Sequence, residues 1–515
     1  MNFKDPFYGY TFILRTIVYV LIPAFTAFQY LRLRRALHVF QLEGYKRRRF
    51  LLWCRANPTL ARFLRSLGDK KPLVMTGRAW RILVSATILN FVAALVLPGM
   101  AHLVAGAPYD LITWVVATTL LFFGAPTLVT AADWLMTPVQ NLINNSYKRK
   151  AQSLLRDVSP IVIGVAGSFG KTSTKFAIAR LLGPPEAAFA TPGSYNTPMG
   201  VVRAINEGLL DSHRYVVVEM GAYRPGDIAE LCDFAGHTIG VLTAIGPAHL
   251  ERFGSMEAIK QAKYEIVQEL PSDGVAVMNT DDLNVRALAD TTTGIAVIRY
   301  GMDRTGDPNV TAREHSYSPE GTTATIVDAD GGELRVTTKL LGEHAIGHIL
   351  AGVAVARLQD IPLGELGPRI ESLEPIEHRL QLIKGAGGVV VIDDAFNSNP
   401  AGAAAALEVL ADFDQSDANR IVVVTPGIIE LGELQAEANQ RFGEHAAMVA
   451  DYLIVVGRLN RDALVRGAEG ASEAARKAEM IVVDTLDDAT EHLKAMLGPG
   501  DVVLFENDLP DQYEV

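Results

Sequence analysis

Cysteine is scarce in this chain of 515 residues, which has only Cys54 and Cys232. Two cysteines cannot form a disulfide framework or a zinc site of four thiolates. They fit a reducing compartment, in which each acts as a small apolar side chain. The sequence also has no internal repeat, no low-complexity tract and no small-residue cleavage site after its first apolar stretch. A disulfide-stabilised scaffold and a cleaved secretory signal are therefore not expected.

Acidic residues are nearly missing from the first part of the chain. Residues 1–150 hold 19 Lys and Arg against 5 Asp and Glu, whereas residues 151–515 hold 28 against 53. A basic, apolar head on an acidic body favours contact with membrane lipids over contact with nucleic acid.

Three apolar stretches lie in this head, at 8–30, 82–104 and 111–130. Each is near the roughly 20 residues that a membrane-spanning helix needs. The first contains Arg15, so a tilted or interfacial helix is an alternative there. Basic residues crowd the loop between the first two stretches, while the link at 105–110 has no Lys or Arg. The positive-inside rule then predicts a multi-pass protein whose remaining chain lies in the cytoplasm.

A glycine-rich turn follows a short β-rich run and precedes a helical pattern that continues to Leu182. Its sequence is Gly164-Val-Ala-Gly167-Ser-Phe-Gly170-Lys171-Thr172. Such glycines let backbone N–H groups converge on phosphate oxygens, at the favourable N-terminus of a helix. The lysine of such a turn reaches the β- and γ-phosphates and the threonine a magnesium ion, although Val165 stands where the strict motif has its first glycine. We expect ATP and Mg²⁺ here, held by Gly167, Ser168, Gly170, Lys171, Thr172 and Ser173.

From residue 158 onward, short β-branched runs alternate with helical patterns, which indicates a parallel sheet covered by helices. The first such runs lie at 216–218, 239–242, 275–278 and 295–298. Residues 305–340 predict a small antiparallel insertion, and a second α/β unit begins near residue 376.

The predicted fold class is therefore α/β, preceded by an α-helical transmembrane module. Residues 1–150 form the membrane module, with two or three transmembrane helices and a basic cytoplasmic loop. Residues 151–375 form a central ATP-binding domain around a parallel sheet that contains the phosphate-binding turn. Residues 376–515 form a C-terminal Rossmann-like α/β domain.

Further motifs follow the glycine-rich turn in one order. They lie at 191–200, 215–221, 245–255, 260–265, 278–282, 378–380, 392–400 and 430–433. Together they resemble the Mur ligase family over roughly residues 158–510. The resemblance implies an ATP-dependent ligase of bacterial peptidoglycan synthesis that works through an acyl phosphate. Its partners would be a cell-wall precursor, such as a muramoyl peptide, and an amino acid or a dipeptide such as D-alanyl-D-alanine.

The same resemblance assigns metal ligands. Glu219 ends a predicted central strand, at the edge where ligands of open α/β sheets bind, and its carboxylate can hold Mg²⁺. The resemblance adds His249 as a second magnesium ligand. It also implies that Lys263 is carbamylated by CO₂ and becomes an anionic ligand. Lys171 and the metal would lower the pKa of that amine, which favours the neutral, reactive form. Lys171, His249 and Lys263 are thus the implied catalytic residues.

Other residues are assigned to the nucleotide and the substrate in the same way. The resemblance places Asn279 at the adenine, Asp394 at the ribose and Arg379 near the phosphates. It gives Asn196 and Thr197 contacts with substrate or metal.

The chain departs from the family pattern in three places. His344-Ala345 and then His348 stand where the family has His-Asn and a later Asn, and residues 505–508 replace a lysine-glycine-serine. The family's uridine-nucleotide domain is replaced by the membrane module. These departures leave open a lipid-linked or poly-γ-glutamate-type substrate, and a membrane scaffold that binds nucleotide without catalysis. The predicted location is the bacterial plasma membrane, with the catalytic domains on its cytoplasmic face.

Overall fold

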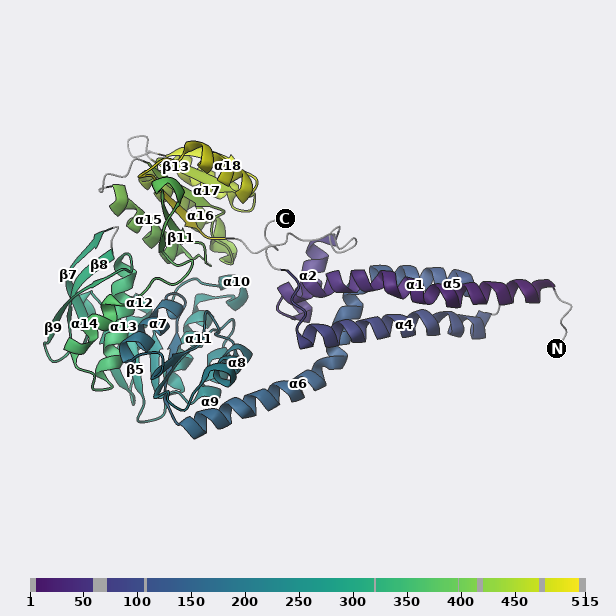
Figure 1. Cartoon of the computed structure of the whole chain (residues 1–515), viewed down its shortest axis with the longest axis horizontal. Coiled ribbons are helices and arrows are strands. Elements are labelled where there is room, and N and C mark those ends of the chain that lie inside the picture. The colour runs from purple at the N-terminus through teal and green to yellow at the C-terminus, as the bar shows by residue number, and fades with distance from the viewer. Residues whose placement is uncertain are drawn as a thin grey trace. The chain divides into compact units, whose positions relative to one another are not determined.

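The computed structural model describes residues 6–58, 72–105, 109–318, 321–396, 398–414, 420–471 and 478–508 (Figure 1). Its contacts divide the chain into two compact units, one up to Ser146 and one from Tyr147 onward. Each unit is described by itself below.

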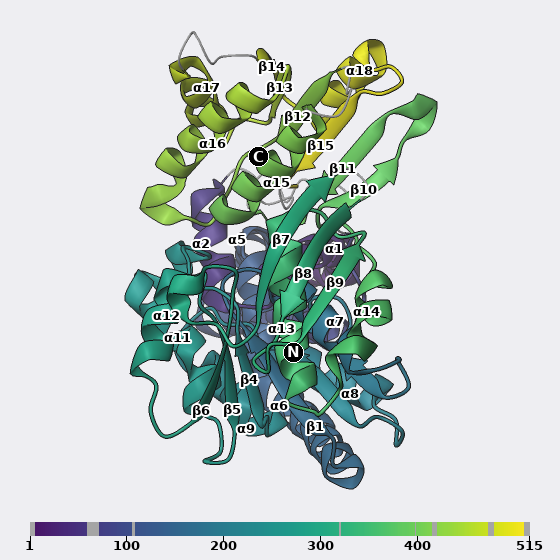
Figure 2. The same ribbon diagram turned by 90° about the vertical axis from the view of Figure 1, so that its left-hand side faces the viewer.

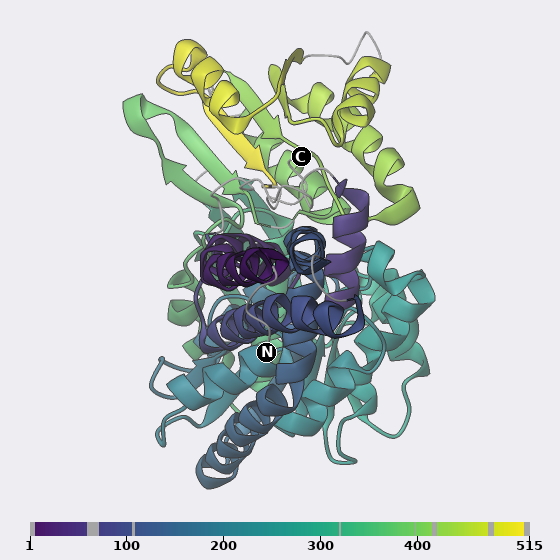
Figure 3. The ribbon, with the colours of Figure 1, turned by 90° about the vertical axis from the view of Figure 1, so that its right-hand side faces the viewer.

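The first unit is helical. Its helices are α1 (Pro6–Leu42), α2 (Arg47–Ala56), α4 (Gly77–Ala105), α5 (Tyr109–Phe123) and the first part of α6 (Ala125–Val158). Helices α1, α4 and α5 pack against one another, and Figure 3 views this bundle nearly end on. Its buried core is apolar and includes Leu37, Phe40, Phe50, Leu83 and Val129.

Polar contacts accompany this apolar core. Gln29 and Arg32 are buried on α1, and they donate to the carbonyls of Leu121 and Phe122 at 2.5 and 3.0 Å. The carboxylate of Asp133 on α6 pairs with Arg78 and Arg47, at 2.9 and 3.2 Å. The first unit is thus held together by its own core and by polar contacts between its helices.

The predicted multi-pass membrane location is wrong. Among the described residues one helix, Gly77–Leu97, is long and apolar enough to cross a membrane. The stretch at 111–130 is broken at Gly124, where Val115–Phe123 and Ala125–Val158 meet with a bend of 74°. It provides a second candidate span only if that bent pair crosses the membrane as one span. As far as the structure describes it, the stretch at 8–30 adds no such helix. The prediction counted apolar length alone, and apolar length does not show where a helix breaks, as at Gly124.

The second unit begins with a six-stranded parallel sheet in the order β2-β3-β1-β4-β5-β6. Figure 2 labels β1, β4, β5 and β6 of this sheet. The strands are β1 (Ile161–Ala166), β2 (Ala188–Ala190), β3 (Tyr215–Glu219), β4 (Ile239–Leu242), β5 (Val275–Asn279) and β6 (Ala296–Tyr300). The helices that follow them are α7 (Lys171–Leu182), α8 (Pro198–Gly208), α9 (Asp227–Ala235), α10 (Leu250–Phe253), α11 (Met256–Gln268) and α12 (Leu283–Thr291). The predicted parallel sheet covered by helices is confirmed.

Alternate residues of these strands enter different layers. Ile163 of β1 belongs to the core beneath α7, whereas its neighbour Val162 belongs to the core beneath α9 and α11. The β-branched runs are therefore buried on both faces, as expected for a central parallel sheet. Strand β1 lies between β3 and β4, so the chain reverses direction across the sheet there, and ligands of such sheets bind at the carboxyl ends near this point.

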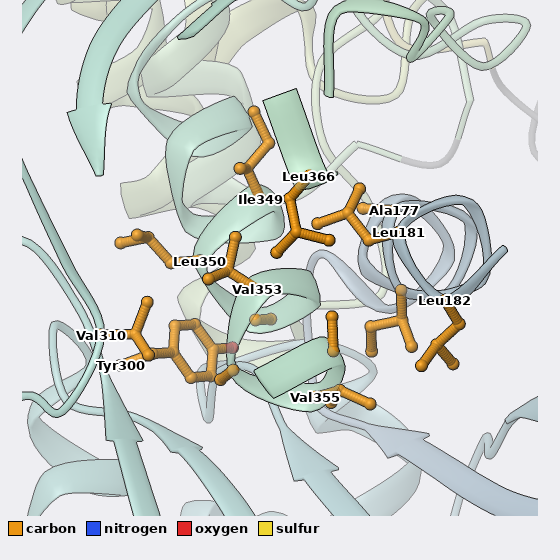
Figure 4. Close-up of a cluster of buried hydrophobic side chains, with 14 of the residues drawn as sticks. Ala177, Leu181, Leu182, Tyr300, Val310, Ile349, Leu350, Val353, Val355 and Leu366 are labelled. Atoms are coloured by element: carbon orange, nitrogen blue, oxygen red, sulfur yellow. The ribbon is translucent and has the colours of Figure 1, made fainter. Parts of the chain in front are cut away.

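An antiparallel sheet and two helices complete the first half of the second unit. The sheet consists of β7 (Thr311–Ser318), β8 (Gly321–Val327) and β9 (Glu333–Thr338), which confirms the predicted insertion. Helices α13 (Glu343–Arg357) and α14 (Leu363–Glu371) follow. Figure 4 shows Leu350 and Val353 of α13 in a buried cluster with Leu181 of α7 and Leu366 of α14. Burial on this scale stabilises by about 1.5–3 kcal/mol per large side chain, so α13 is firmly attached to the helix that follows the glycine-rich turn.

The second half contains another six-stranded sheet, in the order β10-β11-β15-β12-β13-β14. Its strands are β10 (Gln381–Lys384), β11 (Val390–Asp394), β12 (Ile421–Thr425), β13 (Tyr452–Val456), β14 (Glu479–Val483) and β15 (Val502–Glu506). Its helices are α15 (Pro400–Asp414), α16 (Gln435–Val449), α17 (Arg461–Gly470) and α18 (Leu486–Met496). All strand pairs are parallel except β10 with β11, so the predicted C-terminal α/β fold is confirmed and gains an antiparallel edge.

Candidate active site

The glycine-rich turn joins the carboxyl end of β1 to α7. Gly167 has a φ of 154°, and a Cβ on it would lie 2.0 Å from Thr243 Oγ1. Gly170 has a φ of 72° and caps α7 in the left-handed region. Ser168 Oγ donates to Gly246 O at 3.0 Å and accepts from Gly246 N at 3.1 Å. The turn therefore needs its glycines and is held against the segment that follows β4.

Lys171 folds back over this turn. Its Nζ donates to Gly167 O at 2.9 Å and to Ser168 O at 3.2 Å. Burial lowers the pKa of Lys171, against the opposing charge of Glu219, and the nearby Arg379 lowers it further. The ammonium group is held where phosphate oxygens would lie in a turn of this type.

Glu219, at the carboxyl end of β3, forms the centre of a buried polar cluster. Thr172 Oγ1 donates to Glu219 Oε2 at 2.9 Å, and Asn196 Nδ2 donates to Oε1 at 3.0 Å. Lys175 Nζ lies 3.2 Å from Oε2 and donates to Gly193 O at 2.5 Å. The structure thus brings together three predicted residues, Thr172, Asn196 and Glu219, with one that the sequence analysis did not select, Lys175.

The charges in this cluster depend on one another. Burial alone would raise the pKa of Glu219, but Lys175, Lys171 and the hydrogen bonds from Asn196 and Thr172 outweigh burial and lower it. Burial lowers the pKa of Lys175, while Glu219 opposes that change. The carboxylate is therefore ionised and supplies a hard oxygen beside a threonine hydroxyl, which is the donor chemistry that Mg²⁺ prefers.

The protein donors fit a magnesium ion that is shared with a nucleotide. No group of three or more His, Cys, Asp or Glu side chains within the described ranges could hold a metal ion by itself. Mg²⁺ is commonly bound by one or two protein oxygens together with substrate phosphates. The Thr172 and Glu219 oxygens agree with that arrangement.

His249 precedes α10 in a left-handed conformation, with a φ of 55°. Its Nδ1 contacts the carboxylate of Glu430, which also pairs with Arg252. Burial lowers the pKa of His249, and Glu430 opposes this effect. His249, a predicted metal ligand, thus contacts Glu430 in the second half of the unit, a residue to which the sequence analysis gave no role.

Lys263 is buried on α11, with 3% of its surface exposed. Its Nζ lies 5.6 Å from the centre of the Phe253 ring. Burial lowers the pKa of Lys263 far below the ordinary value, and the positive charge of Lys171 adds to this effect. The amine therefore tends toward its neutral, nucleophilic form.

A cavity of about 480 Å³ opens beside the turn. The predicted residues Gly170, Ser173, Asn279, Arg379 and Asp394 line it. Arg379 Nη2 donates to Thr172 Oγ1 at 3.3 Å, which joins the cavity to the Glu219 cluster. Asn279 Nδ2 donates to Thr243 O at 2.9 Å and is held at the cavity wall. The cavity is large enough for a nucleoside and has one arginine near the turn.

Thr197 does not join this group. Its Oγ1 accepts from Gly200 N at 3.4 Å and caps α8, and the residue is exposed. Its visible role is to begin a helix, although it lies next to Asn196.

Helix α13 contributes two histidines to the cavity wall, His344 and His348. His348 Nδ1 lies 2.9 Å from Thr174 Oγ1, and its ring lies against Gly170. Burial lowers the pKa of His348 to about 3, and the neighbouring His344 and Arg379 contribute. The helix at which the chain departs from the family pattern therefore still faces the turn, with a neutral imidazole.

A second departure places a buried carboxyl group beside a partly buried one. Asp394 and Glu506 are register partners at the carboxyl ends of β11 and β15. Ser398 Oγ donates to Glu506 Oε1, and Glu506 is fully buried. Burial raises the pKa of Asp394 to about 6 and raises that of Glu506 well above its usual range. Neither Glu506 nor Lys175 was selected from the sequence. Glu506 lies in the departure noted at residues 505–508, whereas the only signal for Lys175 is its position one helical turn after Lys171.

Two family models match this chain: the Mur ligase middle domain over residues 165–356, and the Mur ligase, glutamate ligase domain over residues 378–506. The chain is 35% identical over 361 residues to the UDP-N-acetylmuramoyl-tripeptide–D-alanyl-D-alanine ligase of Mycobacterium tuberculosis, covering 67% of this chain and 69% of that protein. It is 34% identical over 371 residues to the ligase of the same name from Mycobacterium leprae, with coverage of 67% and 70%. Among solved structures, the MurF ligase of Thermotoga maritima in complex with ADP has a TM-score of 0.62 at 27% identity, over 71% of this chain and 80% of that one.

A phosphate-binding turn at the reversal point of a parallel sheet, beside a second α/β sheet, defines a nucleotide-dependent α/β enzyme. The chain belongs to the Mur ligase family, and its relatives in that family are ATP-dependent ligases. The family inferred from the order of the motifs is confirmed.

Proposed function

We propose that this chain is an ATP-dependent ligase that joins D-alanyl-D-alanine to the carboxyl group of a muramoyl tripeptide carried on UDP. The observation that carries the proposal is the buried Thr172–Glu219 contact of 2.9 Å beside Lys171, at the end of β1. Lys171 supplies the cation that a magnesium–triphosphate complex requires, and Thr172 and Glu219 supply the hard oxygens. The named relatives at 34–35% identity support the choice of substrates.

The nucleotide residues have separate proposed roles. The backbone around Gly167, Ser168 and Gly170 cradles the phosphates, and Lys171 neutralises them. Arg379 acts from the second half of the unit, and its contact with Thr172 supports a place near the phosphates. The cavity beside the turn would take the nucleoside, with Asn279 at the adenine and Asp394 at the ribose; both residues line it. Ser173 lines the same cavity.

Two magnesium ions are proposed. Thr172 and Glu219 would hold one, and His249 with carbamylated Lys263 the other. Bound magnesium would screen the negative charge of the transferred phosphoryl group. The buried Lys263 and its lowered pKa support carbamylation, because only the neutral amine reacts with CO₂. Asn196 orients Glu219 and, with Thr197, lies on the loop proposed to meet the substrate.

The reaction has two steps. A carboxylate oxygen of the tripeptide attacks the γ-phosphorus of ATP, the bond to the β,γ-bridging oxygen breaks, and an acyl phosphate and ADP form. The amino group of the dipeptide then attacks the acyl carbon, loses a proton and expels inorganic phosphate. The protein's part is to align these groups, neutralise charge through Lys171 and Arg379, and exclude the water that would hydrolyse the acyl phosphate.

We also propose domain boundaries near residues 150 and 375. The separation of the described chain at Ser146 supports the first boundary. The interval between the two matched family models, at residues 356 and 378, supports the second.

Mass spectrometry of the product tests this function. The purified chain is incubated with ATP, Mg²⁺, UDP-linked muramoyl tripeptide and D-alanyl-D-alanine, and a UDP-linked pentapeptide is expected. Lys171→Ala should abolish both ADP formation and product. If lipid-linked tripeptide or oligoglutamate were consumed in place of the UDP-linked tripeptide, the substrate assignment would be wrong. If ATP bound without turnover with any acid and amine pair, the chain would be a nucleotide-binding protein without ligase activity.

A further inference from the structure

Glu430 connects the two sheets of the second unit through a single side chain. It lies in the loop after β12 of the second sheet, with a left-handed φ of 64°. Its two carboxylate oxygens contact His249 and Arg252, which flank the start of α10 beside the first sheet. Its carbonyl also accepts from the backbone N–H of Glu251 at 3.5 Å. One residue of the second half thus contacts three positions of a single turn in the first half.

The charges at this contact fix the form of the imidazole. The carboxylate of Glu430 is paired with the guanidinium of Arg252, which has donors only, so Glu430 acts as the acceptor in this contact. His249 Nδ1 must therefore carry the proton that lies between the two side chains. The other ring nitrogen, Nε2, has no partner within the described part of the chain, and in the neutral ring with its proton on Nδ1 it carries the lone pair. A neutral imidazole with a bare nitrogen is the form that binds a metal ion.

The surroundings hold this arrangement in place. Arg252 lies over the ring of Tyr223, 4.6 Å from its centre, and the His249 ring meets the same tyrosine edge to face at 5.1 Å. The side chain of Glu430 is 11% exposed and that of His249 is 23% exposed. Solvent therefore screens the pairing weakly, and the ring cannot rotate without losing contacts on both sides.

We propose that Glu430 is a positioning residue that couples the seating of the second sheet's domain to the orientation of His249. When that domain is seated, the carboxylate of Glu430 holds His249 with Nε2 free for a metal ion. When the domain is displaced, the ring loses its acceptor and its fixed tautomer. This inference rests on the proposed role of His249 as a magnesium ligand, and it concerns a residue to which that proposal gives no part.

The test compares the full-length wild-type chain with Glu430→Ala and with the control Glu433→Gln, an exposed carboxylate three residues away. Nitrogen-15 NMR of labelled histidine, without metal, reports the tautomer of His249. Binding of Mn²⁺ to the ADP complex, followed by electron paramagnetic resonance, reports the metal site. We expect wild type and Glu433→Gln to hold the proton on Nδ1. Glu430→Ala should lose that preference and bind Mn²⁺ about 10–100-fold more weakly, the usual effect of losing a carboxylate behind a metal-bound histidine.

A charge swap separates seating from positioning. Arg252→Glu with Glu430→Arg restores an ion pair between the two halves but places a guanidinium, which cannot accept a hydrogen bond, where Glu430 contacts His249 Nδ1. Hydrogen exchange at α10 should return toward the wild-type rate, while Mn²⁺ binding stays weak. An unchanged tautomer and unchanged Mn²⁺ affinity in Glu430→Ala, or wild-type Mn²⁺ affinity in the swap, would overturn the positioning role. A wild-type chain that holds the proton on Nδ1 but binds no Mn²⁺ with ADP would instead overturn the proposed metal role of His249.

Discussion

Lys175 Nζ lies 3.2 Å from Glu219 Oε2, and the two side chains are 0% and 2% exposed. A buried cation thus faces the carboxylate proposed to hold magnesium, one helical turn after Lys171. Lys175 also donates to Gly193 O on the loop that leads to Asn196. The pair therefore ties the proposed substrate loop to the phosphate-binding helix.

Removing one partner of this pair should destabilise the protein strongly. Lys175→Met leaves Glu219 buried without the cation that contacts it, a change that costs about 3–5 kcal/mol in comparable buried pairs. Chemical denaturation measures the loss. Arg203→Met, which breaks the exposed Arg203–Glu207 pair, is the control and should change stability by less than about 1 kcal/mol.

The double variant Lys175→Met with Glu219→Gln should regain most of the stability, because no uncompensated charge remains. It should not regain ATP turnover, since the proposed metal carboxylate is gone. Equal instability of the single and double variants would contradict a charge effect and point to packing alone.

Gly167→Ala should abolish nucleotide binding. The added Cβ would lie 2.0 Å from Thr243 Oγ1 and 3.1 Å from Ala244 N, so the turn must move away from the end of β4. Calorimetric titration with ADP and Mg²⁺ measures the effect. Gly364→Ala, on α14 away from the cavity and with nothing within 4 Å of the added Cβ, should bind normally. Normal binding by Gly167→Ala would mean that the nucleotide does not use this turn.

Glu506→Gln should stabilise the protein at neutral pH. The folded-state pKa values of Asp394 and Glu506 are raised, so the folded state binds protons that the unfolded state has released, and stability falls as pH rises from about 4 through 6 and above. Glutamine removes one of the two acids and can still accept from Ser398. We expect a gain on the order of 1–3 kcal/mol at pH 8 that disappears near pH 4. Thermal unfolding at both pH values checks this. A gain that did not depend on pH would contradict the claim that the raised pKa values of Asp394 and Glu506 destabilise the folded protein.

Much of the second unit follows from local sequence. The runs around Val216–Val218 and Ile239–Leu242 are β-branched or apolar throughout, which suits strands buried on both faces, and the structure has β3 and β4 there. The glycines before Lys171 and Thr172 let the backbone N–H groups of a strand-to-helix turn converge on phosphate oxygens. The turn lies at the end of β1 as expected. Local patterns suffice here because the constraint is local.

Contacts between distant segments could not be predicted in this way. Glu430 and His249 are 181 positions apart, and no pattern near either residue shows that they meet. Lys175 is a lysine on a helix, and only the folded position of Glu219 shows why it is buried. The multi-pass prediction was wrong for a related reason: composition does not reveal that Gly124 lies at a sharp bend, which breaks the stretch at 111–130.

The fate of one oxygen atom tests the central claim most directly. Muramoyl tripeptide labelled with ¹⁸O in its terminal carboxylate is incubated with the chain, ATP, Mg²⁺ and D-alanyl-D-alanine, and the released phosphate is analysed by mass spectrometry. Transfer through an acyl phosphate predicts one ¹⁸O atom in each phosphate released. Unlabelled phosphate would contradict the account, because the terminal phosphoryl group would then have gone to water and not to the carboxylate.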